Sequence, residues 1–230
     1  MSYLPVFLDV SGRRCVVIGG GHVAERRTVA LLDAGADVTV VSPQLTDSLA
    51  AMVRRGSVRH LDRTFHSGDL SGATLVYAAT DDPEVNRGVA AEARASGIPL
   101  NVADVPELCS FLTPAMVKRG ALQIAISTGG KSPAMAAHLR RYLESIFGPE
   151  YETVLEILGS VRDHLRLAEP ESAQRACKLA ALAASPLAQY VRAGDREGIG
   201  RILTQHLGSS FKIESILNTL DFSNSAQPAR

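Results

Sequence analysis

The sequence predicts an α/β protein, with a parallel sheet domain first, a small mixed segment next and a helical domain last. Three observations predict it. β-Branched runs alternate with helix-length segments over residues 14–103, as is typical of βα units. Residues 19–21 are three consecutive glycines between an apolar run and a helical pattern. Beyond residue 149 only helical periodicity remains, interrupted by proline and glycine. We therefore expect a Rossmann-type fold for the first domain.

In the first domain, apolar and β-branched runs predict strands at residues 14–18, 37–42, 57–61, 74–80 and 99–103. The patterns between them predict helices at residues 22–34, 45–53 and 83–96. Gly35 and Gly97 follow two of these helices as stop signals, and Pro83 suits a first helical turn. Repeated units of this size imply parallel strands with helices on both faces of the sheet.

The pattern changes after Asp104. Two strands are expected at residues 111–117 and 122–127, with a turn at Arg119 and Gly120 between them. Helices are expected at residues 134–147, 150–167, 171–184, 186–193 and 195–207. The sequence thus predicts four parts, namely a sheet domain at 1–110, a central connecting segment at 111–148, a helical domain at 149–222 and a tail at 223–230.

Composition argues against several classes of function. The 230 residues carry 24 basic and 24 acidic side chains, so no global charge favours nucleic acid or an anionic membrane. The three cysteines are far apart, which argues against a cysteine-based metal site and for a reducing compartment. The N-terminus lacks the pattern of a signal peptide, and no apolar run reaches spanning length. We expect a soluble, cytoplasmic protein.

The glycine turn predicts a dinucleotide site formed by Gly19, Gly20 and Gly21. Gly19 permits a tight turn, Gly21 permits close approach of a pyrophosphate, and Ala24 permits close packing of helix on strand. The free N–H groups of the following helix would face the phosphates. A glycine-rich turn that binds nothing is the alternative, and the strand before it and helix after it favour the dinucleotide.

Polar residues after two other strands extend this predicted site. Ser42 stands where many NAD-binding domains carry an acid that holds the ribose, and a hydroxyl there would not repel a 2′-phosphate. Arg26 and Arg27 in the first helix therefore leave NADP open. Thr80 and Asp81 end a buried strand at the carboxyl edge of the sheet, where ligands collect. Capping of the next helix is the alternative role for this segment.

Asp104 follows the last predicted strand of the sheet and would project from the same edge. A carboxylate there would act as a general base, or would contact a metal during chelation. A solvated loop aspartate is the alternative. No cluster of residues with the spacing of a metal site is visible.

A second turn suited to anions precedes the helix expected at 134–147. It combines hydroxyls, glycines and a lysine, in the order Ser127, Thr128, Gly129, Gly130, Lys131 and Ser132. The spacing differs from that of a P-loop, and Ser132 as a simple helix N-cap is the alternative. The basic residues His138, Arg140 and Arg141 favour an acidic ligand.

Together these segments resemble one known family. The stretches LPVFLDVSGRRCVVIGGGHVAERR, VYAATDDPEVN and NVADVPELCSFLTPAMVKRGALQIAISTGGKSP are similar to the precorrin-2 dehydrogenase and sirohydrochlorin ferrochelatase family, which forms the N-terminal module of sirohaem synthases. The resemblance is strong over residues 1–150 and loose beyond them.

The resemblance implies NAD-dependent oxidation of precorrin-2 to sirohydrochlorin, with insertion of Fe²⁺ to give sirohaem in some members. It also implies a homodimer formed through the central segment. The catalytic aspartate of the family falls on Asp104. The cofactor contacts fall on the glycine turn with His22 and Val23, and on Pro43 and Gln44. Fused members continue into a methyltransferase domain that this sequence lacks, so we expect another enzyme to supply precorrin-2.

Three other interpretations stay open at this point. In the first, the protein is a dehydrogenase without chelatase activity; the sequence does not exclude this, because metal insertion needs no ligand motif that a sequence would reveal. In the second, it is a non-enzymatic Rossmann module that senses NAD and regulates a partner, although such a module needs neither Asp104 nor the second turn. In the third, it is a dehydrogenase for a small substrate, which predicts a pocket too small for a macrocycle.

Overall fold

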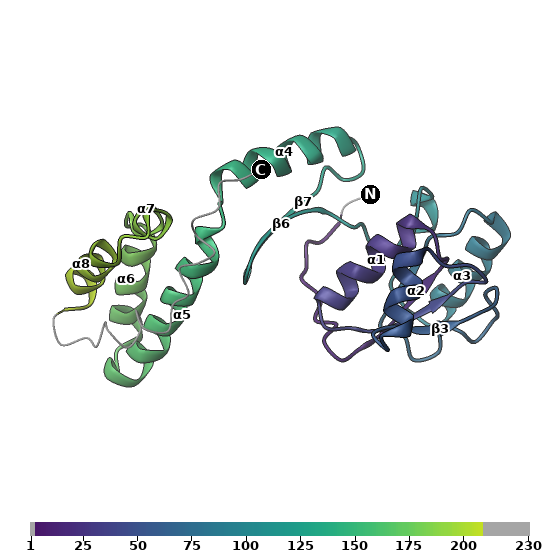
Figure 1. The fold of residues 1–230 in the computed structure, drawn as a ribbon, viewed down its shortest axis with the longest axis horizontal. Coiled ribbons are helices and arrows are strands. Elements are labelled where there is room, and N and C mark those ends of the chain that lie inside the picture. The colour runs from purple at the N-terminus through teal and green to yellow at the C-terminus, as the bar shows by residue number, and fades with distance from the viewer. Residues whose placement is uncertain (1–2, 209–230) are drawn as a thin grey trace. The chain divides into compact units, whose positions relative to one another are not determined.

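Five parallel strands form one sheet in the spatial order β3-β2-β1-β4-β5, which confirms the Rossmann-type fold (Figure 1). They are β1 (Arg14–Ile18), β2 (Asp37–Val41), β3 (Arg59–Leu61), β4 (Leu75–Ala78) and β5 (Leu100–Val102). The structure is a computed structural model that describes residues 3–208. Ile18 pairs with Val41 on one side and with Ala78 on the other. The carboxyl ends of β1, β2 and β4 therefore lie level, and the strand order reverses between β1 and β4, where ligands bind in such sheets.

Helices cover both faces of this sheet. On one face lie α1 (His22–Asp33) and α2 (Asp47–Arg54), and on the other lies α3 (Pro83–Ala95) (Figure 1). Alternate β1 side chains divide between the two cores, because Cys15 and Val17 pack under α1 and α2 whereas Val16 and Ile18 pack under α3. All four are at most 2% exposed, so the strand is apolar throughout, as parallel strands covered on both faces are.

Side-chain caps set the starts of α2 and α3, of which the sequence predicted the second at the observed residue. Helix α2 begins at Asp47 rather than at residue 45, because the Thr46 hydroxyl accepts the Leu49 N–H at 3.2 Å. Helix α3 begins at Pro83, where the Asp82 carboxylate accepts the N–H groups of Glu84 and Val85. Capping of this kind stabilises a helix by about 1 kcal/mol. The capping role expected for the 80–82 segment is thus carried by Asp82.

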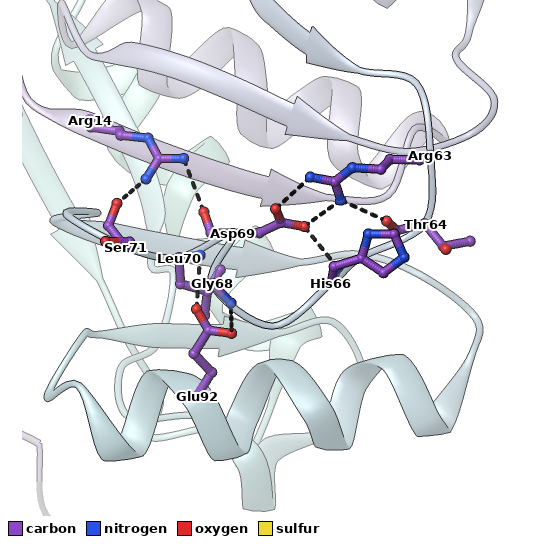
Figure 2. Close-up of polar contacts among 9 residues, drawn as sticks. All are labelled: Arg14, Arg63, Thr64, His66, Gly68, Asp69, Leu70, Ser71 and Glu92. Atoms are coloured by element: carbon purple, nitrogen blue, oxygen red, sulfur yellow. Dashed lines mark hydrogen bonds and ion pairs between the residues drawn. The ribbon is translucent and has the colours of Figure 1, made fainter.

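The crossover from β3 to β4, residues 62–74, contains no helix and is held by charged side chains instead (Figure 2). Arg63 donates two 2.7 Å hydrogen bonds to the Asp69 carboxylate, which also accepts the His66 N–H. From α3, Glu92 accepts the N–H groups of Gly68 and Leu70. Figure 2 shows the side chains of Arg63 and Glu92 on opposite sides of the stretch that contains Asp69. Asp69 is buried, and Arg63 holds the pKa of its carboxyl below the ordinary value.

Residues 3–113 contain this sheet, and a second compact unit begins at Pro114. The strand expected to start at residue 111 starts at Ala115 instead. Phe111 belongs to the first unit, because its ring packs edge-on against Tyr77 and its carbonyl accepts the Asn101 amide at 3.0 Å. Pro114 lacks an N–H, so the strand begins after it.

The second unit opens with an antiparallel pair and continues in helices. β6 (Ala115–Arg119) pairs with β7 (Leu122–Ile126) through a turn in which Gly120 has a φ of +53°. The helices are α4 (Pro133–Ile146), α5 (Glu150–Ala168), α6 (Ser172–Ala183), α7 (Leu187–Ala193) and α8 (Arg196–Leu207), close to the expected bounds. A 3-10 turn at Pro106–Leu108 was not expected from the sequence.

The last four helices share one apolar core. Buried leucine, isoleucine and valine side chains fill it, and they are Val154, Ile157, Val161, Leu165, Leu182, Leu187, Val191, Ile199, Ile202, Leu203 and Leu207. The carboxylate of Glu150 is 2% exposed and is paired with Arg192 of α7. In the region from Tyr3 to Gly208, no helix combines the length and apolar character that crossing a membrane requires. The division of the second unit at residue 148 stays a prediction, and the tail at 223–230 lies outside the described residues.

Candidate active site

The glycine turn after β1 packs closely against the segments that follow the two neighbouring strands, β2 and β4. Gly19 has a φ of +111°, and a Cβ there would lie 2.3 Å from the Ala79 carbonyl oxygen after β4. A Cβ on Gly20 would lie 1.8 Å from the Gln44 carbonyl oxygen, beyond β2. Both positions therefore require glycine for reasons internal to the protein. The Thr46 N–H donates to the Gly20 carbonyl at 2.9 Å and fixes the turn further.

Gly21 differs from its two neighbours because it has no structural need to be glycine. Its φ of −81° suits any residue, and no atom lies within 4 Å of where its Cβ would be. Gly21 is the N-cap of α1, and no side chain caps this helix end. The start of α1, with His22 exposed and Val23 half-buried, thus presents open space and N–H groups together, which suits an anion.

The segment after β2 lies on the opposite side of the glycine turn from β4 and β5. Ser42 is 7% exposed, and its hydroxyl donates to the Gln44 carbonyl at 2.7 Å. The Ser42 side chain therefore shapes the segment from within, whereas Pro43 and Gln44 are exposed to solvent. A ribose held here would meet Pro43 and Gln44 before it met the Ser42 hydroxyl.

Two charged residues near the glycine turn, Glu25 and Arg27, have partners within the protein. Thr46 donates a 2.6 Å hydrogen bond to the Glu25 carboxylate, which lowers the pKa of Glu25. The Arg27 guanidinium lies over the Tyr77 ring, 5.2 Å from its centroid. Arg27 thus packs against β4, which weakens the case for it as a 2′-phosphate ligand. Arg26 is exposed.

A cleft of about 320 Å³ opens at the ends of β4 and β5. The structure brings Thr80, Asp81 and Asp104 together in this cleft with Val23, which lies in the first turn of α1. The remaining lining is mostly apolar and consists of Ala79, Pro83, Asn86, Arg87, Ala103, Val105 and Leu108. Residues that are separate in the chain therefore converge where the sequence predicted a site, at the carboxyl edge of the sheet.

Asp104 has the strained backbone that often marks a functional residue. Its φ is +59°, and it is the only non-glycine residue with positive φ between Tyr3 and Gly208. Aspartate tolerates this left-handed conformation better than most residues, at a cost of roughly 1 kcal/mol. The preceding Ala103 N–H donates to Ala78 at 2.8 Å, which anchors the turn to β4. The exposed carboxylate is thus held at the cleft by the backbone.

Cys109 and Asn101 fix the far side of the Asp104 turn. The Cys109 sulfur accepts the Val102 N–H at 3.2 Å, and its thiol donates to the carbonyls of Val102 and Val105. Burial raises the pKa of this thiol. Asn101 donates to the Phe111 carbonyl. These contacts tie residues 109–111 along β5 and leave Asp104 at the tip of a closed loop.

Asn86 and Arg87 line the cleft but were not among the predicted site residues. Asn86 is 6% exposed and its amide donates to the Thr80 carbonyl at 3.0 Å, which fixes the orientation of the amide group. Its Oδ1 is buried without a hydrogen-bond partner in the described structure. Asn86 and Arg87 follow Pro83 by three and four residues, so helical spacing places them on the same side of α3 as Pro83, which also lines the cleft; this is the one sequence signal that would have found them.

The second predicted turn, residues 127–132, belongs to the second unit. Gly129 and Gly130 have φ values of +62° and +81°, and the Thr128 hydroxyl both accepts from and donates to the Ser132 backbone at 3.1 Å. Ser132 caps α4 by accepting the Met135 N–H, so its capping role is present. Lys131 and Ser127 are exposed.

The basic residues that follow this turn are only partly available. Arg140 forms a 2.7 Å ion pair with Glu144 on the same helix, whereas Arg141 and His138 are exposed. Within residues 3–208, no group of three or more His, Cys, Asp or Glu side chains is arranged to hold a metal ion.

Comparisons with known proteins agree with this geometry. Residues 6–115 match a family model of NAD(P)-binding domains, and residues 119–146 match the model of the central region of sirohaem biosynthesis proteins. Siroheme synthase of Methylobacillus flagellatus is 44% identical over 166 residues, which is 72% of this chain and 36% of that protein. Siroheme synthase of Methylococcus capsulatus is 38% identical over 205 residues, 89% of this chain and 43% of that protein.

A solved structure extends the similarity over most of the chain. The precorrin-2 dehydrogenase SirC aligns with a TM-score of 0.73 at 25% identity, covering 89% of this chain and 98% of that one. The chain spans less than half the length of the siroheme synthases that it matches. With both family models in one chain and these relatives over most of its length, this protein belongs to the family of sirohaem biosynthesis proteins that includes the siroheme synthases and SirC.

Proposed function

We propose that the protein is an NAD-dependent dehydrogenase that oxidises precorrin-2 to sirohydrochlorin. The observation that carries the proposal is the convergence of Asp104, in its left-handed backbone, with Val23 in the first turn of α1, just after the glycine turn, in one cleft. A dinucleotide turn alone would fit many enzymes. The similarity to SirC and to siroheme synthases supports the choice of substrate.

The residues present fit a bound NAD. Gly21 leaves space beside an uncapped helix N-terminus, which suits the pyrophosphate. Pro43 and Gln44, which are exposed after β2, would contact the adenosine ribose. Because β4 and β5 lie on the other side of β1, the nicotinamide end would enter the cleft. The unpartnered Oδ1 of Asn86 is an acceptor beside this end of the site.

Asp104 would act as the proton acceptor. When bound, NAD⁺ takes up two electrons and one proton from the substrate as a hydride. The oxidation releases a second proton, and the Asp104 carboxylate would hold it before passing it to water. At about 320 Å³ the cleft lies at the small end of ligand pockets. We therefore propose that it receives the nicotinamide and the reacting edge of the macrocycle, rather than the whole macrocycle.

The turn at residues 127–132 would contribute to binding the carboxylates of precorrin-2. Its exposed Lys131 and the N–H groups at the start of α4 are suited to acidic groups. The Ser127 hydroxyl accepts the Gly129 N–H, and Thr128 braces the same turn from inside. The two glycines with positive φ give the turn its shape.

The test is an anaerobic spectrum of precorrin-2 with the protein and NAD⁺, in the wild type and in Asp104→Asn. Asparagine tolerates the same backbone, so the fold should persist. We expect the wild type to form sirohydrochlorin and the variant to lose about 10²–10⁴-fold in kcat, with NAD⁺ affinity unchanged. A variant that turns over at the wild-type rate would contradict the role of Asp104. A wild type that converts nothing would contradict the proposed function.

Insertion of Fe²⁺ into sirohydrochlorin is a second candidate activity. Two carboxylates, Asp81 and Asp104, line one cleft, and metal entry into a tetrapyrrole releases two pyrrole protons that such groups would accept. The iron is a substrate here, and its ligands would be the macrocycle nitrogens. Incubation of sirohydrochlorin with Fe²⁺ or Co²⁺ and the protein should accelerate the spectral change of metal insertion over the protein-free rate. The same rate with and without protein would leave dehydrogenation as the sole activity.

We further propose that the protein acts as a homodimer through the second unit. Helix α4 carries no buried residue and presents exposed Met135, Leu139, Tyr142 and Ile146 along one face. β6 and β7 form only a two-stranded sheet, which is marginal by itself in water. A second copy would cover both. A cytoplasmic location, which NAD use and unpaired cysteines favour, stays a prediction.

A further inference from the structure

Arg87 is the one basic side chain among the described residues that line the cleft at the ends of β4 and β5. It shares that lining with the carboxylates of Asp81 and Asp104, and the remaining walls are apolar apart from Thr80 and Asn86. Without Arg87 these walls would carry acidic charge only. A polycarboxylate substrate would then be repelled from the place where Asp104 has to reach it.

The guanidinium of Arg87 is not committed to a structural role. Its one partner among the described residues is Glu84, three residues earlier on α3, and their side chains are 59% and 80% exposed. Such an exposed pair contributes only a few tenths of a kcal/mol. Glu84 itself does not line the cleft. A substrate carboxylate that binds in the cleft would therefore displace little when it pairs with Arg87, because the exposed pair with Glu84 is weak and a guanidinium can hold a carboxylate through two hydrogen bonds.

The position of Arg87 excludes the two charged parts of the cofactor as its partner. The pyrophosphate would lie at the glycine turn and the start of α1, whereas Arg87 lies on α3 beside the ends of β4 and β5. The nicotinamide ring of NAD⁺ is itself cationic, so an arginine gains nothing from facing it. An acidic group of the substrate is the remaining partner at this end of the cleft.

We infer that Arg87 is a substrate-binding residue. Its guanidinium breaks its pair with Glu84 and binds one carboxylate of a polycarboxylate tetrapyrrole instead. The inference rests on the proposed function for the identity of the substrate. The planar fork of the guanidinium holds a carboxylate through two parallel hydrogen bonds. This pairing orients the macrocycle edge toward Asp104, which lies in the same cleft.

The experiment compares Arg87→Gln with two matched variants. Arg94→Gln removes the same charge from an exposed position on α3 outside the cleft, and Glu84→Gln frees Arg87. Binding of sirohydrochlorin, followed by its absorption, and binding of NAD⁺, followed by calorimetry, are measured for each protein, together with KM and kcat for precorrin-2.

We expect R87Q to weaken sirohydrochlorin binding and raise the KM for precorrin-2 by about tenfold, which is the effect of one charge-assisted pair. NAD⁺ affinity and Tm should stay at wild-type values. R94Q should bind as the wild type does, and E84Q about twofold more tightly. Wild-type sirohydrochlorin binding by R87Q would overturn the inference, as would a loss of NAD⁺ affinity in its place.

The two proposals fail in different ways. If the wild type does not oxidise precorrin-2 but binds sirohydrochlorin, and R87Q binds it more weakly, the proposed activity is wrong and the role of Arg87 stands. If the wild type oxidises precorrin-2 and R87Q matches it in KM and binding, the activity stands and the role of Arg87 is wrong. If the wild type neither binds nor converts a tetrapyrrole, both are wrong.

Discussion

Alanine at two adjacent glycines of the turn should separate folding from cofactor binding. At Gly20 the new Cβ would lie 1.8 Å from the Gln44 carbonyl oxygen and 2.8 Å from the Ser42 hydroxyl. Because the nearer atom is backbone, the segment after β2 has to move, and overpacking of this kind costs about 3 kcal/mol. At roughly 4 °C per kcal/mol for a domain near 100 residues, Gly20→Ala should lower the Tm by about 10 °C.

Gly21→Ala should leave the Tm unchanged and weaken NAD⁺ binding. Its φ of −81° and the empty space around it accept a methyl group. The gain from a less flexible unfolded chain and the loss of glycine as N-cap each amount to less than about 1 kcal/mol, so they offset one another. A methyl group between backbone and pyrophosphate should nevertheless weaken NAD⁺ binding at least about tenfold, or 1.4 kcal/mol.

Thermal denaturation and calorimetric titration with NAD⁺ of both variants test this reasoning. Gly21→Ala with wild-type affinity would refute the assignment of the turn to the pyrophosphate. Gly20→Ala with wild-type Tm would refute the close approach of the Gln44 carbonyl. Loss of NAD⁺ affinity in Gly20→Ala decides nothing by itself, because a displaced turn would weaken binding whether or not the turn contacts the pyrophosphate.

Two further predictions concern the parts that surround the site. Asp69→Asn should lower the free energy of unfolding by about 2 kcal/mol, because an amide N–H₂ would replace an oxygen that accepts from Arg63 or from the His66 backbone, and urea unfolding measures it. The pKa of Asp69 is lowered in the folded protein, so its contribution to the free energy of unfolding is complete above the unfolded carboxyl pKa of about 4. This contribution is lost as the pH falls through the pKa of the folded protein. A difference in unfolding free energy between wild type and variant that persists in stronger acid would contradict this. If the protein forms the proposed homodimer, Leu139→Glu should convert it to a monomer in sedimentation velocity, whereas Ser145→Glu, which adds the same charge off the apolar face, should not. An unchanged sedimentation coefficient for Leu139→Glu would contradict the proposal that α4 forms the interface.

The sheet and its edge could be predicted from the sequence because one physical signal dominates there. Strands buried on both faces are apolar throughout, and a glycine turn after the first of them leaves few other folds. Asp104 follows such a strand directly, so its place at the carboxyl edge followed from topology. The helix capped by Asp82 begins at the expected residue, and the one capped by Thr46 begins two residues after the expected one.

Other features depend on contacts between residues far apart in the chain. Phe111 looks like the first residue of a strand, yet its packing on Tyr77 keeps it in the first unit. Ser42 looks like a ribose ligand, yet its hydroxyl bonds to Gln44. The charged network around Asp69 has no periodicity at all, because a loop held by Arg63 and Glu92 resembles any polar loop in sequence. Arg87 could be found only after the lining of the cleft was known.

The bracing of the glycine turn has a consequence for how fast and how tightly a cofactor binds. The turn, the end of β4 and the segment after β2 are already in contact, through Gly19 on one side and Gly20 on the other. A dinucleotide that meets such a frame loses its own conformational freedom but orders little of the protein, so most of its contact energy remains as affinity. Thr46→Ala would keep the N–H that donates to Gly20 but would remove the hydroxyl that joins this frame to Glu25 of α1, and the looser frame should slow association of the cofactor.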